Sequence, residues 1–186
     1  EITWDVTSAE KSGYEHFMLK EIMEQPQALR ETMRGRLSDG GKRINLAELD
    51  LTAAEIKNVS KVFIVACGTA YHAGLVGKYL IEKILRIPVE VDVASEFRYR
   101  DPLLCEKTLV IVISQSGETA DTLAALRLAR ERGQQVLAIT NVVGSSVARE
   151  ADKVLFTWAG PEVAVASTKA YLTQLLALYM LTLYFA

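Results

Sequence analysis

Six consecutive residues, Ser-Gln-Ser-Gly-Glu-Thr at 114–119, place three hydroxyl groups and one side-chain amide in a short segment. The five residues before them, 109–113, are apolar and mostly β-branched, which predicts a strand buried on both faces. After them, residues 120–130 carry leucines at 123, 126 and 128, a helical spacing. The polar segment is therefore expected to join the carboxyl end of a buried strand to the amino end of a helix.

A turn at that position favours an anion. The first backbone amides of a helix have no acceptor within the helix, and the helix dipole adds about half a positive charge there. Ser114, Gln115, Ser116 and Thr119 can add hydrogen bonds to a phosphate without bringing a competing positive charge. We therefore expect residues 114–119 to bind a phosphate group.

Two observations count against this interpretation. Ser116 or Thr119 would serve equally well as a simple helix cap, because Ser and Thr are preferred N-cap residues. One cap requires only one hydroxyl, however, and the turn supplies three. Glu118 and Asp121 would repel a phosphate placed beside them, so the interpretation requires both carboxylates to point away from the turn.

Length and composition limit the class of protein. The chain has 186 residues, 50% of them hydrophobic, which is enough to bury a sizeable core in one domain with an appendage. The formal net charge is −2 and no run of Lys or Arg occurs, which argues against a nucleic-acid surface and against binding to an anionic membrane. Cys67 and Cys105 form no CxxC motif and there is no His-rich tract, so neither a disulfide framework nor a metal site is expected. The expected location is the reducing cytoplasm.

Both ends suggest a piece of a longer chain. The sequence begins at Glu1 and shows no signal peptide. Residues 170–186 carry no charge but fall short of the roughly 20 apolar residues that span a bilayer. A helix that is apolar all round is usually buried. We therefore expect a core helix whose outer face meets a second domain or a second subunit.

The chain in between falls into a helical lead-in and an alternating part. Residues 1–12 are expected to be a tail or linker, followed by two helices, 14–23 and 27–37, which Pro26 separates, and by a turn at 38–41. From residue 61 onward, strands alternate with helices, which predicts a parallel sheet with helices on both faces. The expected strands are 62–66, 89–93, 109–113, 136–140 and 154–156.

Parallel sheets bind ligands in a crevice outside the carboxyl ends of their strands, where the strand order reverses. The order 2-1-3-4-5 would bring residues 68–70 and residues 114–119 side by side at that edge. Residues 164–169 follow the fifth strand and are expected to approach the same crevice. Neither GxGxxG nor GxxxxGK[ST] occurs, which disfavours a dinucleotide site or a P-loop.

Four other side chains are candidates for chemistry. Cys67 lies five residues before His72, but a Cys at the end of a buried strand is usually a small hydrophobic residue. Lys169 suggests a Schiff-base lysine, although a lysine at the start of a helix is usually solvated. His16 is a lone histidine and is more often packed or solvated than a ligand.

Five motifs stand out in the sequence: CGTAYHAG at 67–74, VASEFRYRDP at 93–102, SQSGETADTL at 114–123, NVVGSS at 141–146 and VASTKAY at 165–171. Together they resemble the sugar isomerase domain of the glutamine:fructose-6-phosphate amidotransferase family, also called the glucosamine-6-phosphate synthase family. The segment at 16–26, HFMLKEIMEQP, resembles the entry of that family into its isomerase half. The resemblance spans nearly the whole chain, whereas SQSGET alone marks only the wider sugar isomerase (SIS) domain family.

The resemblance implies a three-layer, doubly wound α/β domain with a flavodoxin-like five-stranded parallel sheet. It implies a linker and helical lead-in at 1–45, and a SIS phosphosugar-binding domain at 46–186 that is the first of two tandem copies. Ala70 stands where the family often has Ser, so only its backbone is expected to bind. The implied phosphate ligands are Ser114, Gln115, Ser116 and Thr119, and the implied sugar-lining residues are Thr69, Ala70, Val165 and Ser167.

The same resemblance implies fructose 6-phosphate or glucosamine 6-phosphate as ligand, with no metal or organic cofactor. It assigns no catalytic residue to this chain, because the family's catalytic groups belong to a glutaminase domain and to the second SIS copy with its C-terminal tail. Those two domains, together with a second copy of the chain in a homodimer, are the expected partners. A phosphosugar-sensing module of a regulator and a sugar-phosphate aldose-ketose isomerase remain alternatives.

Overall fold

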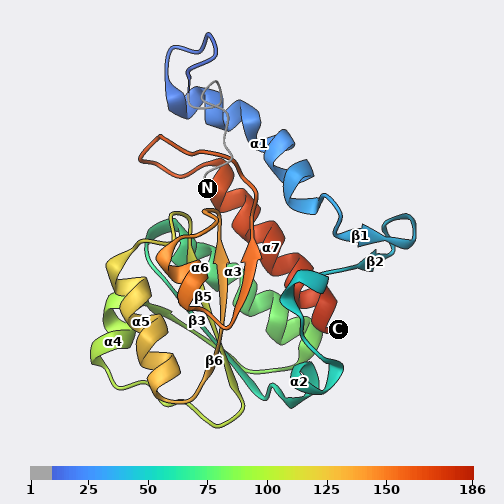
Figure 1. Ribbon diagram of the computed structural model, residues 1–186, viewed down its shortest axis with the longest axis vertical. Helices are drawn as coiled ribbons and strands as arrows, with labels where there is room; N and C mark the ends of the chain where they lie inside the picture. Colours follow the sequence, from blue (N-terminus) through green and yellow to red (C-terminus); the bar gives the residue numbers. More distant parts are fainter. Residues whose placement is uncertain (1–9) are drawn as a thin grey trace.

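A computed structural model describes residues 10–186, so most of the linker expected at 1–12 lies outside the described residues. Its centre is a five-stranded sheet with the order β4-β3-β5-β6-β7, in which every neighbouring pair is parallel (Figure 1). This order is the expected 2-1-3-4-5. The strands are β3 (Lys61–Ala66), β4 (Val89–Val93), β5 (Thr108–Ser114), β6 (Gln135–Thr140) and β7 (Lys153–Phe156).

Helices cover both faces of the sheet and confirm the three-layer α/β fold (Figure 1). Alternate residues of β5 point to opposite faces, so Ile111 belongs to one core cluster and Val112 to the other. The Ile111 side is covered by α3 (Gly68–Leu85) and α7 (Lys169–Phe185). The Val112 side is covered by α4 (Ala94–Tyr99), α5 (Ala120–Glu131) and α6 (Ser146–Glu150).

The lead-in is one helix rather than two. Helix α1 (Phe17–Met33) continues through Pro26, and the predicted break there is wrong. Proline has no N–H to donate to the carbonyl of the residue four positions earlier, which is Ile22. The side-chain amide of Gln25 donates to that carbonyl instead, at 2.9 Å. The carbonyl therefore keeps a partner and the helix continues.

The segment between α1 and the sheet holds small elements that the sequence interpretation missed. The turn expected at 38–41 joins two short antiparallel strands, β1 (Leu37–Ser38) and β2 (Arg43–Ile44), and contains the 3-10 turn η2 (Asp39–Gly41). A second 3-10 turn, η3 (Ala47–Leu49), precedes α2 (Ala53–Asn58). Thr52 and Glu55 form a reciprocal capping box at the start of α2, a sequence signal that could have predicted this helix.

Helices α3 and α7 pack closely on one face of the sheet. A Cβ atom at Gly77 of α3 would meet the Leu178 side chain of α7 at 3.0 Å, so glycine permits this approach. Helix α1 runs along the outer side of α7 (Figure 1). In the part of the chain that the structure describes, no helix is long and apolar enough to cross a membrane.

Candidate functional site

The turn between β5 and α5 is held by its own hydroxyl groups. The hydroxyls of Ser114 and Thr119 lie 3.1 Å apart, and the Gly117 amide donates to Ser114 Oγ at 3.0 Å. Ser116 Oγ accepts from the Glu118 amide at 3.2 Å. Thr119 is the N-cap residue of α5 but its side chain makes no capping hydrogen bond. Capping α5 therefore does not explain the hydroxyls of this turn.

The loop between β6 and α6 supports the turn from one side. The Asn141 amide donates to the Gln115 carbonyl at 3.2 Å, and the Val147 amide donates to the Gly117 carbonyl at 3.0 Å. Gly117 has a φ of +67°, and a Cβ atom there would lie 2.1 Å from Ser145 Oγ. Only glycine fits this position without moving the neighbouring loop.

Glu118 points out of the turn, as an anion site requires. Its Oε1 accepts from the Ser146 amide at 2.8 Å, at the first residue of α6. That backbone hydrogen bond lowers the pKa of Glu118 below its usual value of 4.5. Neither Glu118 nor Asp121 lines the cavity beside the turn.

A cavity of about 210 Å³ lies at the carboxyl edge of the sheet, against this turn. Three segments that are distant in sequence form its walls: the start of α3, the turn at 114–119 and the loop before α7. All eight residues expected to bind the phosphosugar line this one cavity. They are Thr69, Ala70, Ser114, Gln115, Ser116, Thr119, Val165 and Ser167.

Two buried polar residues in the cavity wall were not predicted. Thr122 lies one turn after Thr119 on α5, and Gln174 lies on α7. Thr122 Oγ1 and Gln174 Oε1 have no hydrogen-bond partner among the described residues. Such buried groups are uncommon in folded proteins. A sequence signal existed for Gln174, which is an isolated amide in an otherwise apolar helix.

Glu162 also lines the cavity, but its carboxylate is already engaged. Its Oε1 accepts from the amides of Thr168 and Ala170 at 3.0 and 3.1 Å, at the start of α7. Its Oε2 accepts from Ser167 Oγ at 3.3 Å. The negative charge of Glu162 therefore lies on the amino end of α7, which favours it.

Of the other candidates, Cys67 lines the cavity, but His72 is exposed and packs edge-to-face on the Tyr71 ring. No hydrogen bond joins His72 to Cys67 in the described chain. His16 is exposed beside Glu15. The expectation that Lys169 is solvated is wrong, because its side chain is buried and its Nζ contacts Glu24 Oε2 at 2.6 Å. Residues 10–186 contain no cluster of metal-binding side chains.

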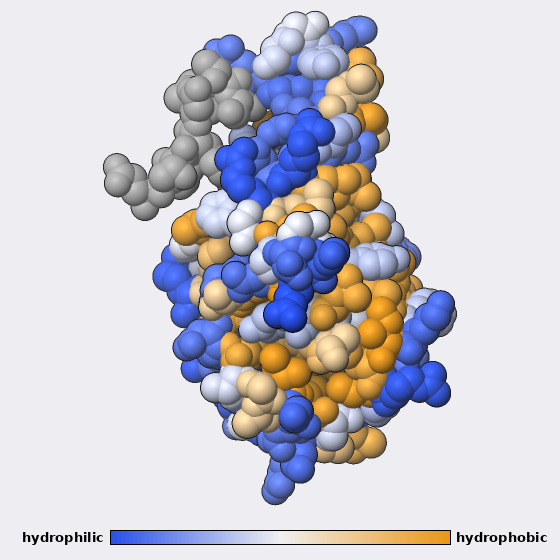
Figure 2. Space-filling view, turned by 90° about the vertical axis from the view of Figure 1, so that its right-hand side faces the viewer, coloured by the Kyte–Doolittle hydropathy of each residue, from blue (hydrophilic) through white to orange (hydrophobic). Residues whose placement is uncertain are grey.

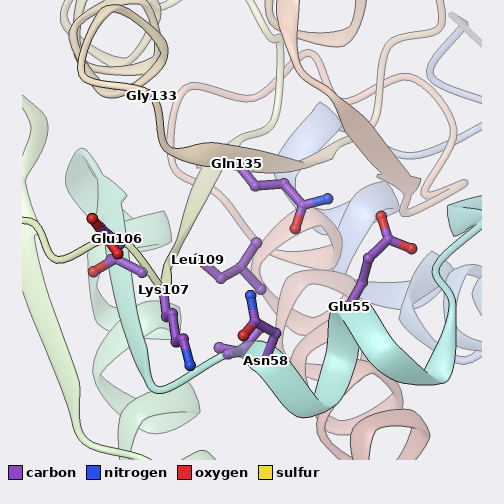
Figure 3. A pocket seen from close by; sticks show the side chains of 9 residues that line it. Glu55, Asn58, Glu106, Lys107, Leu109, Gly133 and Gln135 are labelled. Atoms are coloured by element: carbon purple, nitrogen blue, oxygen red, sulfur yellow. The ribbon is translucent and has the colours of Figure 1, made fainter.

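A second hollow lies at the opposite edge of the sheet (Figure 3). This cavity of about 150 Å³ is bordered by the amino ends of β5 and β6 and by α2. Its charged groups are the carboxylates of Glu55 and Glu106 and the ammonium of Lys107. Two carboxylates against one ammonium do not suit a phosphate, so this hollow does not compete with the site at the carboxyl edge.

Comparison with known proteins gives consistent relatives. Residues 55–184 match the family described as SIS domain. The chain is 66% identical over 185 residues to the glutamine--fructose-6-phosphate aminotransferase (isomerizing) of Clostridium acetobutylicum, and 65% identical over 186 residues to that of Caldanaerobacter subterraneus. Both matches cover all of this chain. The chain spans only 30% of the length of those relatives.

A solved structure agrees with these matches. The C-terminal domain of glucosamine-fructose-6-phosphate aminotransferase from Francisella tularensis superposes with a TM-score of 0.86 and is 46% identical. The alignment covers 95% of this chain and 49% of that chain. The described fold therefore corresponds to about half of that solved domain.

Proposed function

Since this chain belongs to the SIS domain family, we propose that it is the phosphosugar-binding part of an enzyme that makes glucosamine 6-phosphate and glutamate from fructose 6-phosphate and glutamine. The names of its relatives support this assignment. The main observation in support of this proposal is that all eight expected binding residues, which come from three separate segments, line one cavity. Such a site lies where α/β sheets bind ligands.

In this proposal, the turn at 114–119 binds the phosphate. The side chains of Ser114, Gln115, Ser116 and Thr119 supply hydrogen bonds, and the amino end of α5 supplies a positive potential. Because the hydroxyls of Ser114 and Thr119 now bond to each other, both can rotate toward a ligand oxygen without any backbone movement.

The sugar lies against the other two walls of the cavity. Thr69 and the backbone of Ala70, at the start of α3, face it from one side, and Val165 and Ser167 face it from the loop before α7. Ala70 has no polar side chain, so its contribution is limited to backbone groups. No cofactor is part of this proposal.

Turnover is proposed to require parts of the parent protein beyond this chain. We assign no catalytic residue to residues 1–186 and expect the glutaminase domain and a second SIS domain of the parent to supply them. We also propose a boundary near residue 45 between the lead-in and the SIS domain, a homodimer, and a cytoplasmic location, which the two free cysteines support.

The cavity does not support the alternative of an aldose-ketose isomerase. An aldose-ketose isomerase acting alone would require a carboxylate and a histidine as acid and base in the crevice. The described cavity contains no histidine, and its one carboxylate, Glu162, accepts hydrogen bonds from two backbone amides and a hydroxyl.

Calorimetric titration of the 186-residue chain with fructose 6-phosphate tests the proposal. Removing a hydrogen bond to a charged group costs about 1.5 to 3 kcal/mol, so Ser116→Ala should weaken binding about ten- to a hundredfold. Ser60→Ala, the same change at an exposed serine just before β3, should leave the affinity unchanged. Equal affinities for wild type and Ser116→Ala would contradict the proposal.

A further inference from the structure

Helix α1 carries a buried carboxylate that faces the loop before α7. Glu21 is only 2% exposed. Its Oε1 accepts from the backbone amides of Val163 and Ala164, at 2.6 and 3.2 Å. These contacts join residues more than 140 positions apart in sequence. A buried carboxylate is costly unless it is hydrogen bonded. Oε2 of Glu21 is buried with no hydrogen-bond partner among the described residues, so the two amide contacts to Oε1 are what hold this side chain in place.

The loop that Glu21 binds forms the sugar-facing wall of the candidate cavity. Ala164, whose amide is one of the two bonded to Glu21, lines that cavity, as do Val165 and Ser167 after it. No backbone-to-backbone hydrogen bond ties residues 161–167 to the rest of the described chain. The loop is instead held by carboxylates, Glu21 near its beginning and Glu162 at the start of α7. Without Glu21, the amides of Val163 and Ala164 lose their partner.

A buried charge cluster fixes α1 in the position that this contact requires. Glu24, one turn after Glu21, contacts Lys169 Nζ with Oε2 at 2.6 Å and Lys20 Nζ with Oε1 at 3.5 Å. Both lysines are buried, and Lys169 is the first residue of α7. Glu24, which is partly exposed, is therefore a shared partner of both buried lysines and offsets part of the cost of burying their charges. The cluster joins α1 to the helix that follows the loop.

We propose that Glu21 is a positioning residue of the phosphosugar site: it contacts no ligand but holds Val165 and Ser167 where the sugar binds. This inference rests on the proposed function. Helix α1 would then contribute to ligand binding, although it lies outside residues 55–184, which match the SIS domain family. Because Glu21 acts on the sugar wall and not on the turn at 114–119, its loss should affect sugar recognition and spare phosphate recognition.

The test compares two ligands, fructose 6-phosphate and inorganic phosphate, by NMR titration of the 186-residue chain. Glu21→Leu should weaken fructose 6-phosphate binding about ten- to a hundredfold, because small displacements of binding groups carry costs of this size, and should leave phosphate binding unchanged. Glu21→Gln retains an acceptor oxygen and should restore most of the affinity. If Glu21→Leu does not fold, Glu21→Asp, which shortens the side chain by one methylene, should show the same selective loss.

The outcomes separate this inference from the proposed function. Ser116→Ala should weaken both ligands. Unchanged binding of both ligands in folded Glu21→Leu or Glu21→Asp, or equal losses for both, would overturn the positioning role. If the wild-type chain binds neither ligand, the proposed function itself fails and the positioning role fails with it.

Discussion

Among single residues, the hydroxyls of the turn at 114–119 differ in the hydrogen bonds that they make within the protein. Ser114 Oγ accepts from the Gly117 amide and contacts Thr119, so it shapes the turn as well as facing the cavity. Ser116 Oγ accepts only from the adjacent Glu118 amide. Substituting Ser116 therefore disturbs the turn less, which is why Ser116→Ala is the sharper test of binding.

The carboxylate of Glu118 makes stability depend on pH. Its hydrogen bond to the Ser146 amide lowers its pKa below 4.5 in the folded chain. A lowered folded-state pKa contributes stability that is present above the unfolded value and is lost as the pH falls through the folded value. Glu150, paired with Arg127, and Glu90, paired with Lys61, have lowered pKa values as well. The melting temperature should therefore fall as the pH drops below about 4.5.

Glu118→Gln provides the matched comparison for that prediction. The glutamine cannot titrate, so thermal melts between pH 7 and pH 3 should show a smaller acid-induced loss of melting temperature than in wild type. Glu106→Gln, at an exposed glutamate for which no hydrogen bond or ion pair is described, should follow the wild-type curve. A Glu118→Gln profile that coincides with wild type would show that the Ser146 contact does not form in solution.

At the scale of elements, the turn depends on the loop that supports it. Gly117→Ala would place a methyl group 2.1 Å from Ser145 Oγ and would also strain a positive φ. The turn and the loop before α6 must then separate, so we expect a lower melting temperature and loss of fructose 6-phosphate binding. Gly133→Ala shares a positive φ, at +75°, but meets no atom within 4 Å. This control should lose stability only and keep the affinity.

Calorimetric titration and thermal melts of both variants measure the difference. If Gly117→Ala binds fructose 6-phosphate as tightly as Gly133→Ala, the close packing of the turn is not needed for the site.

The elements also show what the sequence could predict. The inner strands β3, β5 and β6 were predicted because nearly continuous apolar runs specify buried parallel strands, whereas β4 at the sheet edge alternates valines with Glu90 and Asp92. Pro26 misled the interpretation, because the pattern did not show that the side chain of Gln25, three residues after Ile22, donates to the Ile22 carbonyl in place of the missing proline N–H. The burial of Lys169 was missed for a different reason, since its partner Glu24 lies 145 residues away in the sequence. The strand order alone predicted that three loops meet at the candidate site. The presence of Glu162 and Thr122 in the cavity wall could be recognised only once the positions of the neighbouring residues were known.

At the scale of the whole molecule, one side of the chain is markedly apolar. Figure 2 shows hydrophobic residues gathered over the middle of the face that includes the right-hand side of Figure 1. On α7, Tyr179 is 45% and Leu183 is 50% exposed, and Met23 of α1 is 59% exposed. Exposed apolar area of this kind is typical of an interaction surface. It is consistent with the proposed homodimer and with a neighbouring domain of the parent protein.

The proposed self-association predicts a concentration-dependent mass. Light scattering coupled to size-exclusion chromatography should show an average mass above 20.6 kDa as the concentration rises. Leu183→Gln should shift the mass toward that of the monomer. Leu103→Gln, the same change at an exposed leucine between α4 and β5, should not. A strict monomer at high concentration would remove self-association from the proposal.

A crystal structure of the chain with fructose 6-phosphate bound would show directly whether the cavity is the ligand site. The proposed function predicts the phosphate at the amino end of α5, within hydrogen-bonding distance of Ser116 Oγ and the amides of the turn at 114–119, with the sugar against Val165 and Ser167. A ligand bound elsewhere, with the Ser114–Thr119 hydrogen bond intact and the cavity empty, would contradict it.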